Sequence, residues 1–144
     1  MKIKFIHVLV ATALILISSA CSSSRKTIAI EEGWDLLGEK TINFVKDNDE
    51  LFVSSNNTYT DIKFQVEKKD IIIKDLKIVY QNGDKLSPAI PDLIKAGEMS
   101  KDIHLTDGGK SIRSIEIKYR STGSILKGRG KILIFGKRYL GYQY

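Results

Sequence analysis

The feature that most constrains the fold is an alternation of apolar and polar side chains that returns along the chain. In residues 62–67, Ile, Phe and Val alternate with Lys, Gln and Glu, and the same period of two recurs in residues 76–80 and 115–120. A period of two places one row of side chains on a core and the other in water, which is typical of strands in a half-exposed sheet. No long segment after residue 20 shows helical periodicity. The pattern therefore predicts strands.

Turn signals separate these segments. Asn82-Gly83 is a strong turn signal because both residues tolerate a positive φ, and Pro88 and Pro91 exclude a central strand from residues 85–100. Within that segment we expect one helical turn at residues 92–96, and Gly38 is expected to be a bulge or a close contact in the first strand. The expected strands are 34–44, 51–54, 62–67, 71–80, 103–105, 112–120 and 131–135, with turns at 46–50, 56–57, 68–70, 81–84 and 106–109. The continuous apolar run at 132–135 predicts a strand buried on both faces.

This rhythm defines the fold class. Short strands joined by short turns favour an all-β protein, with a single antiparallel β-sandwich, or a partly closed barrel, of about eight short strands. The length of 144 residues fits one domain. We expect a signal peptide at residues 1–20, a lipidated cysteine with a polar tether at 21–27, and the sandwich at 28–144.

The first twenty residues are typical of an export signal. Lys2 and Lys4 precede an apolar run at residues 5–17, and small residues follow at 18–20. This is the order of a secretory signal, and the run is shorter than the roughly 20 apolar residues of a transmembrane helix. The chain is therefore expected to be exported.

Cys21 decides between two ways of processing this signal. It is the only cysteine of the chain, so no internal disulfide is possible, and Ser19-Ala20-Cys21 resembles the end of a bacterial lipobox, although Ser18 stands where Leu is usual. Cleavage before Cys21 would give a diacylglycerol-modified lipoprotein, and Ser22 in place of Asp favours the outer membrane, facing the periplasm. The alternative is ordinary cleavage, which releases a soluble protein with a free thiol.

Charge is distributed unevenly along the chain. Residues 110–144 carry a net charge of +8, whereas residues 21–109 carry −4. One interpretation is a positive face that meets anionic lipid or another envelope polyanion. The other is that the basic strands pair with acidic ones and the charges cancel. Export disfavours nucleic acid as a partner. The candidate anionic-surface residues are Lys118, Arg120, Lys127, Arg129, Lys131, Lys137 and Arg138.

Catalytic and metal motifs are missing from the sequence. It contains no nucleophile elbow, zinc-protease motif or phosphate loop. His104 lies between Ile103 and Leu105 and is expected to point outward as an ordinary strand residue. Asp49 and its neighbours in 46–50 lack calcium-loop spacing. We therefore expect that the protein is not an enzyme and has no catalytic residue, cofactor or metal. The alternative is a hydrolase of envelope polymers whose two carboxylates come from distant strands.

Several short motifs occur in a familiar order. This order resembles a family of small exported bacterial domains of unknown function, family 2541, over about residues 34–136. The resemblance implies an exported, β-rich unit and carries over no catalytic residue, because the family has no established activity. The motifs are Trp34-x-Leu36-Leu37-Gly38, Asp47-x-Asp49, Lys77-Ile78-Val79-Tyr80-x-Asn82-Gly83, Ile94-x-x-Gly97, Ile103-x-Leu105, Gly108-Gly109, Ile115-x-Ile117-x-Tyr119-Arg120-Ser121 and residues 130–136.

Together these observations predict a lipid-anchored protein of the cell envelope, of unknown molecular activity. We expect a non-catalytic structural or ligand-binding module that meets the membrane through its lipid anchor. The alternative is a soluble periplasmic or secreted binding protein.

Overall fold

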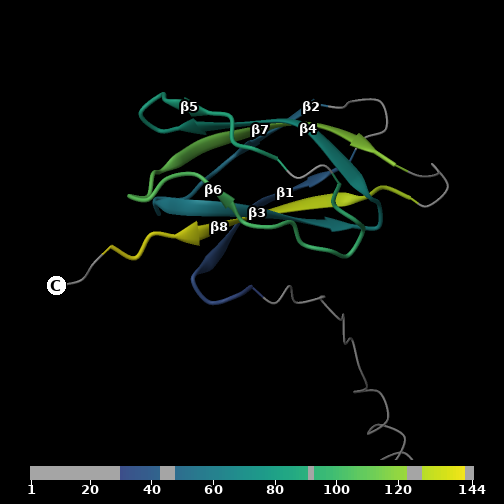
Figure 1. Cartoon of the computed structure of the whole chain (residues 1–144), viewed down its shortest axis with the longest axis horizontal. Helices are drawn as coiled ribbons and strands as arrows, with labels where there is room; N and C mark the ends of the chain where they lie inside the picture. The colour runs from purple at the N-terminus through teal and green to yellow at the C-terminus, as the bar shows by residue number, and fades with distance from the viewer. Residues whose placement is uncertain (1–29, 43–47, 91–92, 123–127, 142–144) are drawn as a thin grey trace, which may run out of the picture.

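A computed structural model of the chain describes residues 30–42, 48–90, 93–122 and 128–141. These residues form two four-stranded antiparallel sheets packed face to face (Figure 1), and no helix occurs among them. The predicted all-β sandwich is confirmed, and the sheets do not close into a barrel. Sheet A has the order β1-β8-β3-β6 and sheet B the order β2-β7-β4-β5. The strands are β1 Trp34–Thr41, β2 Asn48–Phe52, β3 Tyr59–Glu67, β4 Ile71–Tyr80, β5 Lys85–Leu86, β6 Ile103–His104, β7 Ile112–Ser121 and β8 Lys131–Arg138.

The core lies between the two sheets. Alternate residues of the long strands point inward, such as Ile132 and Ile134 of β8 and Ile115 and Ile117 of β7, and all four are at most 3% exposed. β8 pairs with β1 and β3, and β7 pairs with β2 and β4, so each is an inner strand of its sheet. Burial on both faces of residues 132–135 confirms the prediction for this apolar run.

Gly38 confirms both parts of its prediction. The register between β1 and β8 shifts between Leu36 and Gly38, which marks a bulge. A Cβ at residue 38 would lie 2.6 Å from a methyl carbon of Leu51 on β2. Glycine is therefore required here because the edge strands of the two sheets approach each other closely.

The predicted turn at residues 46–50 is wrong in its second half. Asn48–Phe52 form β2, which pairs with β7 from Asn48 opposite Lys118 to Phe52 opposite Ser114. The acidic composition favours a turn, but a neighbouring strand supplies backbone partners that the local sequence does not reveal. The hydroxyl of Tyr119 also donates a 2.7 Å hydrogen bond to Asp49. Residues 43–47 lie outside the described residues.

The irregular segment 85–100 forms edges of both sheets. β5 is a two-residue edge strand beside β4, and Ile94 is buried and bridges Ile71. Met99 bridges Gln65 of β3, so the chain extends sheet A at this point. The described residues 93–96 form no helical turn, because the backbone N–H and C=O of Ile94 both pair with Ile71 of β4. No segment of the described chain is a helix long and apolar enough to cross a membrane.

Candidate functional site

The basic residues that the sequence singles out are spread over the two sheets. Lys118 and Arg120 lie on β7 and point away from the core, on the outer face of sheet B. Lys131 and Lys137 lie on β8, on the outer face of sheet A. Arg138 ends β8, and Arg129 precedes that strand. The structure does not bring the six described residues onto one face, and Lys127, like Cys21, lies outside the described residues.

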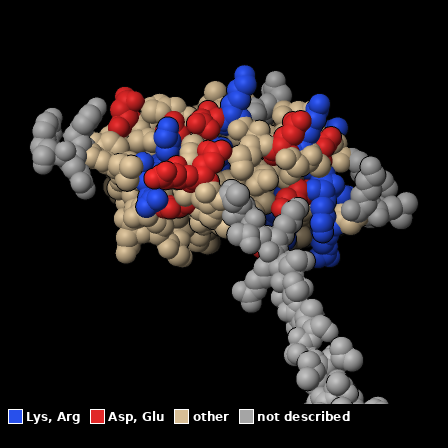
Figure 2. All heavy atoms as spheres, turned by 90° about the horizontal axis from the view of Figure 1, so that it is seen from below, with Lys and Arg blue, Asp and Glu red and all other residues tan. Residues whose placement is uncertain are grey.

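Three of these side chains pair with a carboxylate of a neighbouring strand. Lys131 lies 3.0 Å from Glu39 of β1, Arg138 lies 3.3 Å from Asp35 of β1, and Lys118 lies 4.0 Å from Asp75 of β4. Figure 2 views the molecule from the side of sheet A and shows basic and acidic side chains intermixed. Cross-strand pairing therefore offsets part of the charge asymmetry of the sequence.

The outer face of sheet B carries a band of charged side chains. Glu116 of β7 lies between Glu50 of β2 and Lys77 of β4, and Lys77 is 3.1 Å from Glu116. A hollow of about 290 Å³ opens beside them, lined by carboxylates and by Lys118. No Asp or Glu among the described residues is buried, and burial is the usual means of raising a carboxyl pKa for acid catalysis. The geometry of the hollow singles out no general acid.

His104 points outward, as the sequence predicts, with Ile103 and Leu105 buried on either side. Its Nδ1 lies 3.1 Å from Asp61 and its Nε2 lies 3.1 Å from Asp107. Both ring nitrogens are therefore engaged by carboxylates, an arrangement that offers no nucleophile for activation. Groups of three or more side chains able to hold a metal are also missing from the described residues.

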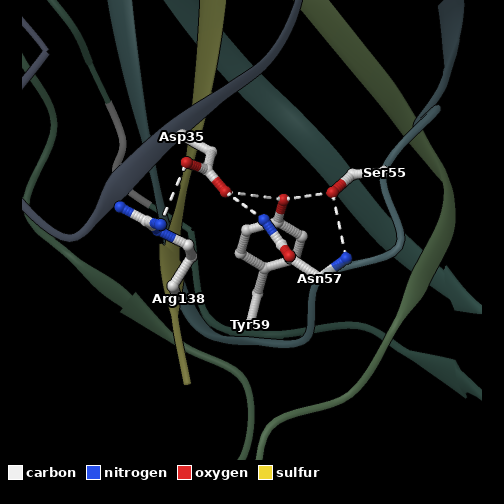
Figure 3. A network of polar contacts seen from close by, with 5 residues as sticks. All are labelled: Asp35, Ser55, Asn57, Tyr59 and Arg138. Carbon is white, nitrogen blue, oxygen red and sulfur yellow. Dashed lines mark hydrogen bonds and ion pairs between the residues drawn. The ribbon is translucent and has the colours of Figure 1, made fainter. Parts of the chain in front are cut away.

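A polar network joins three stretches that are distant in sequence, namely Asp35, residues 55–59 and Arg138 (Figure 3). Asp35 of β1 accepts hydrogen bonds from Asn57 at 2.8 Å and from the Tyr59 hydroxyl at 3.1 Å, in addition to its ion pair with Arg138. The hydroxyls of Tyr59 and Ser55 lie 2.7 Å apart. The network thus ties β1, β3 and β8 to the loop between β2 and β3.

The polar groups of this network bond to one another, so its role is to hold these segments together. Burial, followed by the negative charge of Asp35, raises the pKa of Tyr59, so the phenol keeps its proton and cannot serve as a base for Ser55. The Asp35 carboxylate already has three partners. Gly136 makes room for the ring, because a Cβ there would lie 2.6 Å from Tyr59 Cδ1.

A second polar cluster lies beside Tyr80, at the start of the β4–β5 turn. The ammonium of Lys110 sits 4.9 Å from the centre of the Tyr80 ring and 3.2 Å from Asp84. Hydrogen bonds from Asn82 and then from Lys110 lower the pKa of Asp84, whereas burial raises the pKa of Tyr80. The Tyr80 hydroxyl is buried and has no hydrogen-bond partner among the described residues. A hollow of about 270 Å³ adjoins this cluster.

The outer face of sheet A carries a small hydrophobic cluster that the alternation does not predict. Trp34, Leu133 and Phe135 pack together apart from the main core and are at most 7% exposed. The ammonium of Lys63 lies 4.0 Å from the centre of a Trp34 ring and 2.7 Å from Glu31. Lys63 is therefore buried, although its place on the polar side of β3 predicts exposure to water. We call Trp34, Lys63, Leu133 and Phe135, with Glu31, the sheet A cluster.

Sequence reasoning missed the polar network and the sheet A cluster for the same reason. Their members are contributed by strands and loops far apart in sequence, and no motif connects them. The one available signal is the run of apolar residues at 132–135, which predicts burial on both faces. That prediction indicates a covered outer face, but it does not identify Trp34 and Lys63 as the cover.

The fold and these clusters define a small antiparallel β-sandwich with no recognisable catalytic centre among its described residues. The chain belongs to the family described as Domain of unknown function (DUF2541), whose model matches residues 8–136. This confirms the resemblance stated on the sequence. No curated protein and no solved structure matches the chain.

Proposed function

We propose that this protein is a lipid-anchored, non-catalytic module of the cell envelope, held at the membrane by Cys21. The observation that carries the proposal is the position of the only cysteine, directly after an export-like segment that ends in Ser19-Ala20. The match of the family model begins at residue 8, so it includes part of this apolar segment. Two or more acyl chains anchor a protein firmly, because each buried CH₂ contributes about 0.8 kcal/mol.

The described surface supports a binding or structural role more than turnover. Its histidine contacts two carboxylates, and the polar groups of the network around Tyr59 bond to one another. Exposed lysines such as Lys137 add attraction to anionic headgroups, about 1 kcal/mol for each residue close to the surface. Because several other basic residues are already paired, we propose anionic lipid as a secondary contact rather than as the main ligand.

The test is the intact mass and the membrane partition of the full chain expressed in its own host, beside a Cys21→Ser variant. We expect the wild type to gain the mass of its lipid and to sediment with membranes, and the variant to do neither. A matched control, Cys21→Ser combined with Ser24→Cys, keeps one thiol but moves it by three positions, and it should remain unmodified.

If the wild type is cut after Ala20 and stays soluble, the anchor is disproved and a soluble periplasmic binding protein becomes the better proposal. Turnover of an envelope polymer by the purified protein, lost on one substitution in the folded domain, would instead disprove the non-catalytic part.

A further inference from the structure

We propose that the anchored domain lies with the outer face of sheet A against the bilayer surface, so that the outer face of sheet B points away from it. This inference rests on the proposed lipid anchor at Cys21. It adds an orientation and names the lipid bilayer as the partner of one particular face.

The first argument is where the chain joins the domain. Glu31 is fixed to Lys63 by a 2.7 Å ion pair, and its carbonyl accepts a 3.0 Å hydrogen bond from the backbone of Trp34. Lys63 lies opposite Phe135 in the register of β3 and β8, so this attachment lies over an inner strand of sheet A rather than at its edge. In Figure 1 the described start of the chain accordingly lies below sheet A. The tether therefore starts from the outer face of this sheet.

The second argument is length. Nine positions separate Cys21 from Ile30, and a fully extended chain covers at most about 30 Å over that number of residues. The domain is thus held close to the bilayer, with the tether starting from sheet A. A short linker creates a high effective concentration, so a weak contact with the lipid surface is sufficient to orient the domain.

The third argument is the exposed apolar rim on the outer face of sheet A. Ile30, Leu36 and Met99 border the sheet A cluster and are 45%, 37% and 39% exposed. Leu36 lies opposite Phe135, and Met99 lies opposite Gln65, so both side chains share the outer face with the cluster. Lys137 on the same face forms no ion pair with a described residue and can meet a lipid phosphate. A bilayer surface offers both kinds of partner, hydrocarbon and phosphate.

Net charge does not distinguish the two faces, so the orientation rests on the attachment point, the tether length and the exposed apolar rim. Glu39, Asp61 and Glu67 lie on the outer face of sheet A, opposite Leu133, Lys137 and Lys131 of β8. The outer face of sheet B likewise carries both signs, with Glu50 and Glu116 beside Lys77, Lys118 and Arg120.

Trp34 can serve as a fluorescent probe of this face, because it is the only tryptophan of the chain and belongs to the sheet A cluster. The lipidated full chain is reconstituted into vesicles of phosphatidylethanolamine and phosphatidylglycerol, with and without a headgroup nitroxide label. We expect the label to quench the emission of Trp34. The matched control is Trp34→Phe combined with Phe52→Trp, which moves the fluorophore to an exposed position on sheet B, and its emission should be kept.

A second variant tests the contact itself. Leu36→Glu combined with Met99→Glu should keep the lipid mass and the circular dichroism of the wild type but lose most of the quenching of Trp34. Equal quenching of the wild type and the Phe52→Trp control would overturn the orientation, as would no quenching of either. A dimer in detergent that Leu36→Glu dissociates would overturn it too, by assigning the face to a second copy.

The mass of the reconstituted protein separates the two proposals. Lipidated protein whose Trp34 is not quenched overturns only the orientation, whereas protein without the lipid mass overturns the anchor and the orientation with it.

Discussion

The outer faces of the two sheets obey the same alternation but are used differently. On sheet B the outward side chains of β2, β7 and β4 form a band of charges, with Lys77 next to Glu116 and Lys118 next to Asp75. On sheet A the outward side chains in the middle of β8 are Leu133 and Phe135, and Lys63 is buried over Trp34. The comparison shows that a period of two determines which residues share a face of the sheet. Whether that face is exposed to water depends on the segments that lie over it.

The largest expected effect contrasts one phenylalanine from each outer face. Phe135→Ala should lower the free energy of unfolding by about 3–5 kcal/mol, because it leaves a cavity among Trp34, Leu133 and the stem of Lys63. Phe52→Ala removes a side chain that is 67% exposed and should change stability by less than about 0.5 kcal/mol. Urea unfolding followed by circular dichroism measures both.

Equal losses for these two variants would show that the outer face of sheet A is no better packed than that of sheet B. Leu36→Ala, on the partly exposed rim of the same cluster, should fall between the two.

A smaller effect contrasts one buried tyrosine from each sheet. Tyr59→Phe removes the hydroxyl that contacts Asp35 and Ser55 and should cost about 1–2 kcal/mol. Tyr80→Phe removes a buried hydroxyl without a described partner and should be neutral within about 0.5 kcal/mol, or stabilising. The urea midpoints of the two variants at neutral pH distinguish these outcomes.

The same pair of variants predicts a pH dependence. The pKa of each phenol is raised above its ordinary value of 10.0 in the folded state, for both mainly by burial. The folded state therefore holds these protons more tightly, so stability is full below about pH 10 and falls as the pH rises through the folded pKa. Each Tyr→Phe variant should lose less stability than the wild type between pH 9 and 11, a range of about one unit on either side of that value. Parallel pH profiles for all three proteins would contradict the assignment.

The sequence predicts the long strands well and the contacts between them poorly. Residues 62–67, 76–80 and 115–120 carry their own period of two, so the strands that contain them follow from local pattern. β2 does not, because Asn48-Asp49-Glu50 has the composition of a turn and becomes a strand only through its pairing with β7. Local pattern also could not pair Lys131 with Glu39, since 92 positions separate them and only the register of β1 and β8 brings them together.

The candidate sites show the same limit. The alternation places Lys63 in water, and this is wrong because Glu31 and Trp34, about thirty residues earlier, cover it. Asp35 has no motif that links it to Tyr59. Whether a side chain on the outer face of a sheet is buried depends on which other segments cover that face. A single sequence therefore indicates such burial only where the apolar run is continuous, as in residues 132–135.

The smallest expected effect concerns the charge band of sheet B. Glu50 and Glu116 lie directly opposite each other on β2 and β7, and like charges in that position repel. Glu50→Gln should therefore leave stability unchanged or raise it by a few tenths of a kcal/mol, in the range of about 0.2–1 kcal/mol typical of cross-strand pairs. Glu116→Gln also loses the ion pair with Lys77, so its net change in stability should be less favourable than that of Glu50→Gln.

Because these carboxylates are exposed, the difference in stability between the two variants should shrink when salt is raised from low concentration to 1 M, where the screening length is about 3 Å. Urea midpoints at the two salt concentrations measure it. A difference that survives high salt would mean that packing rather than charge distinguishes the two glutamates, and the contrast between a charged face and a packed face would then be lost.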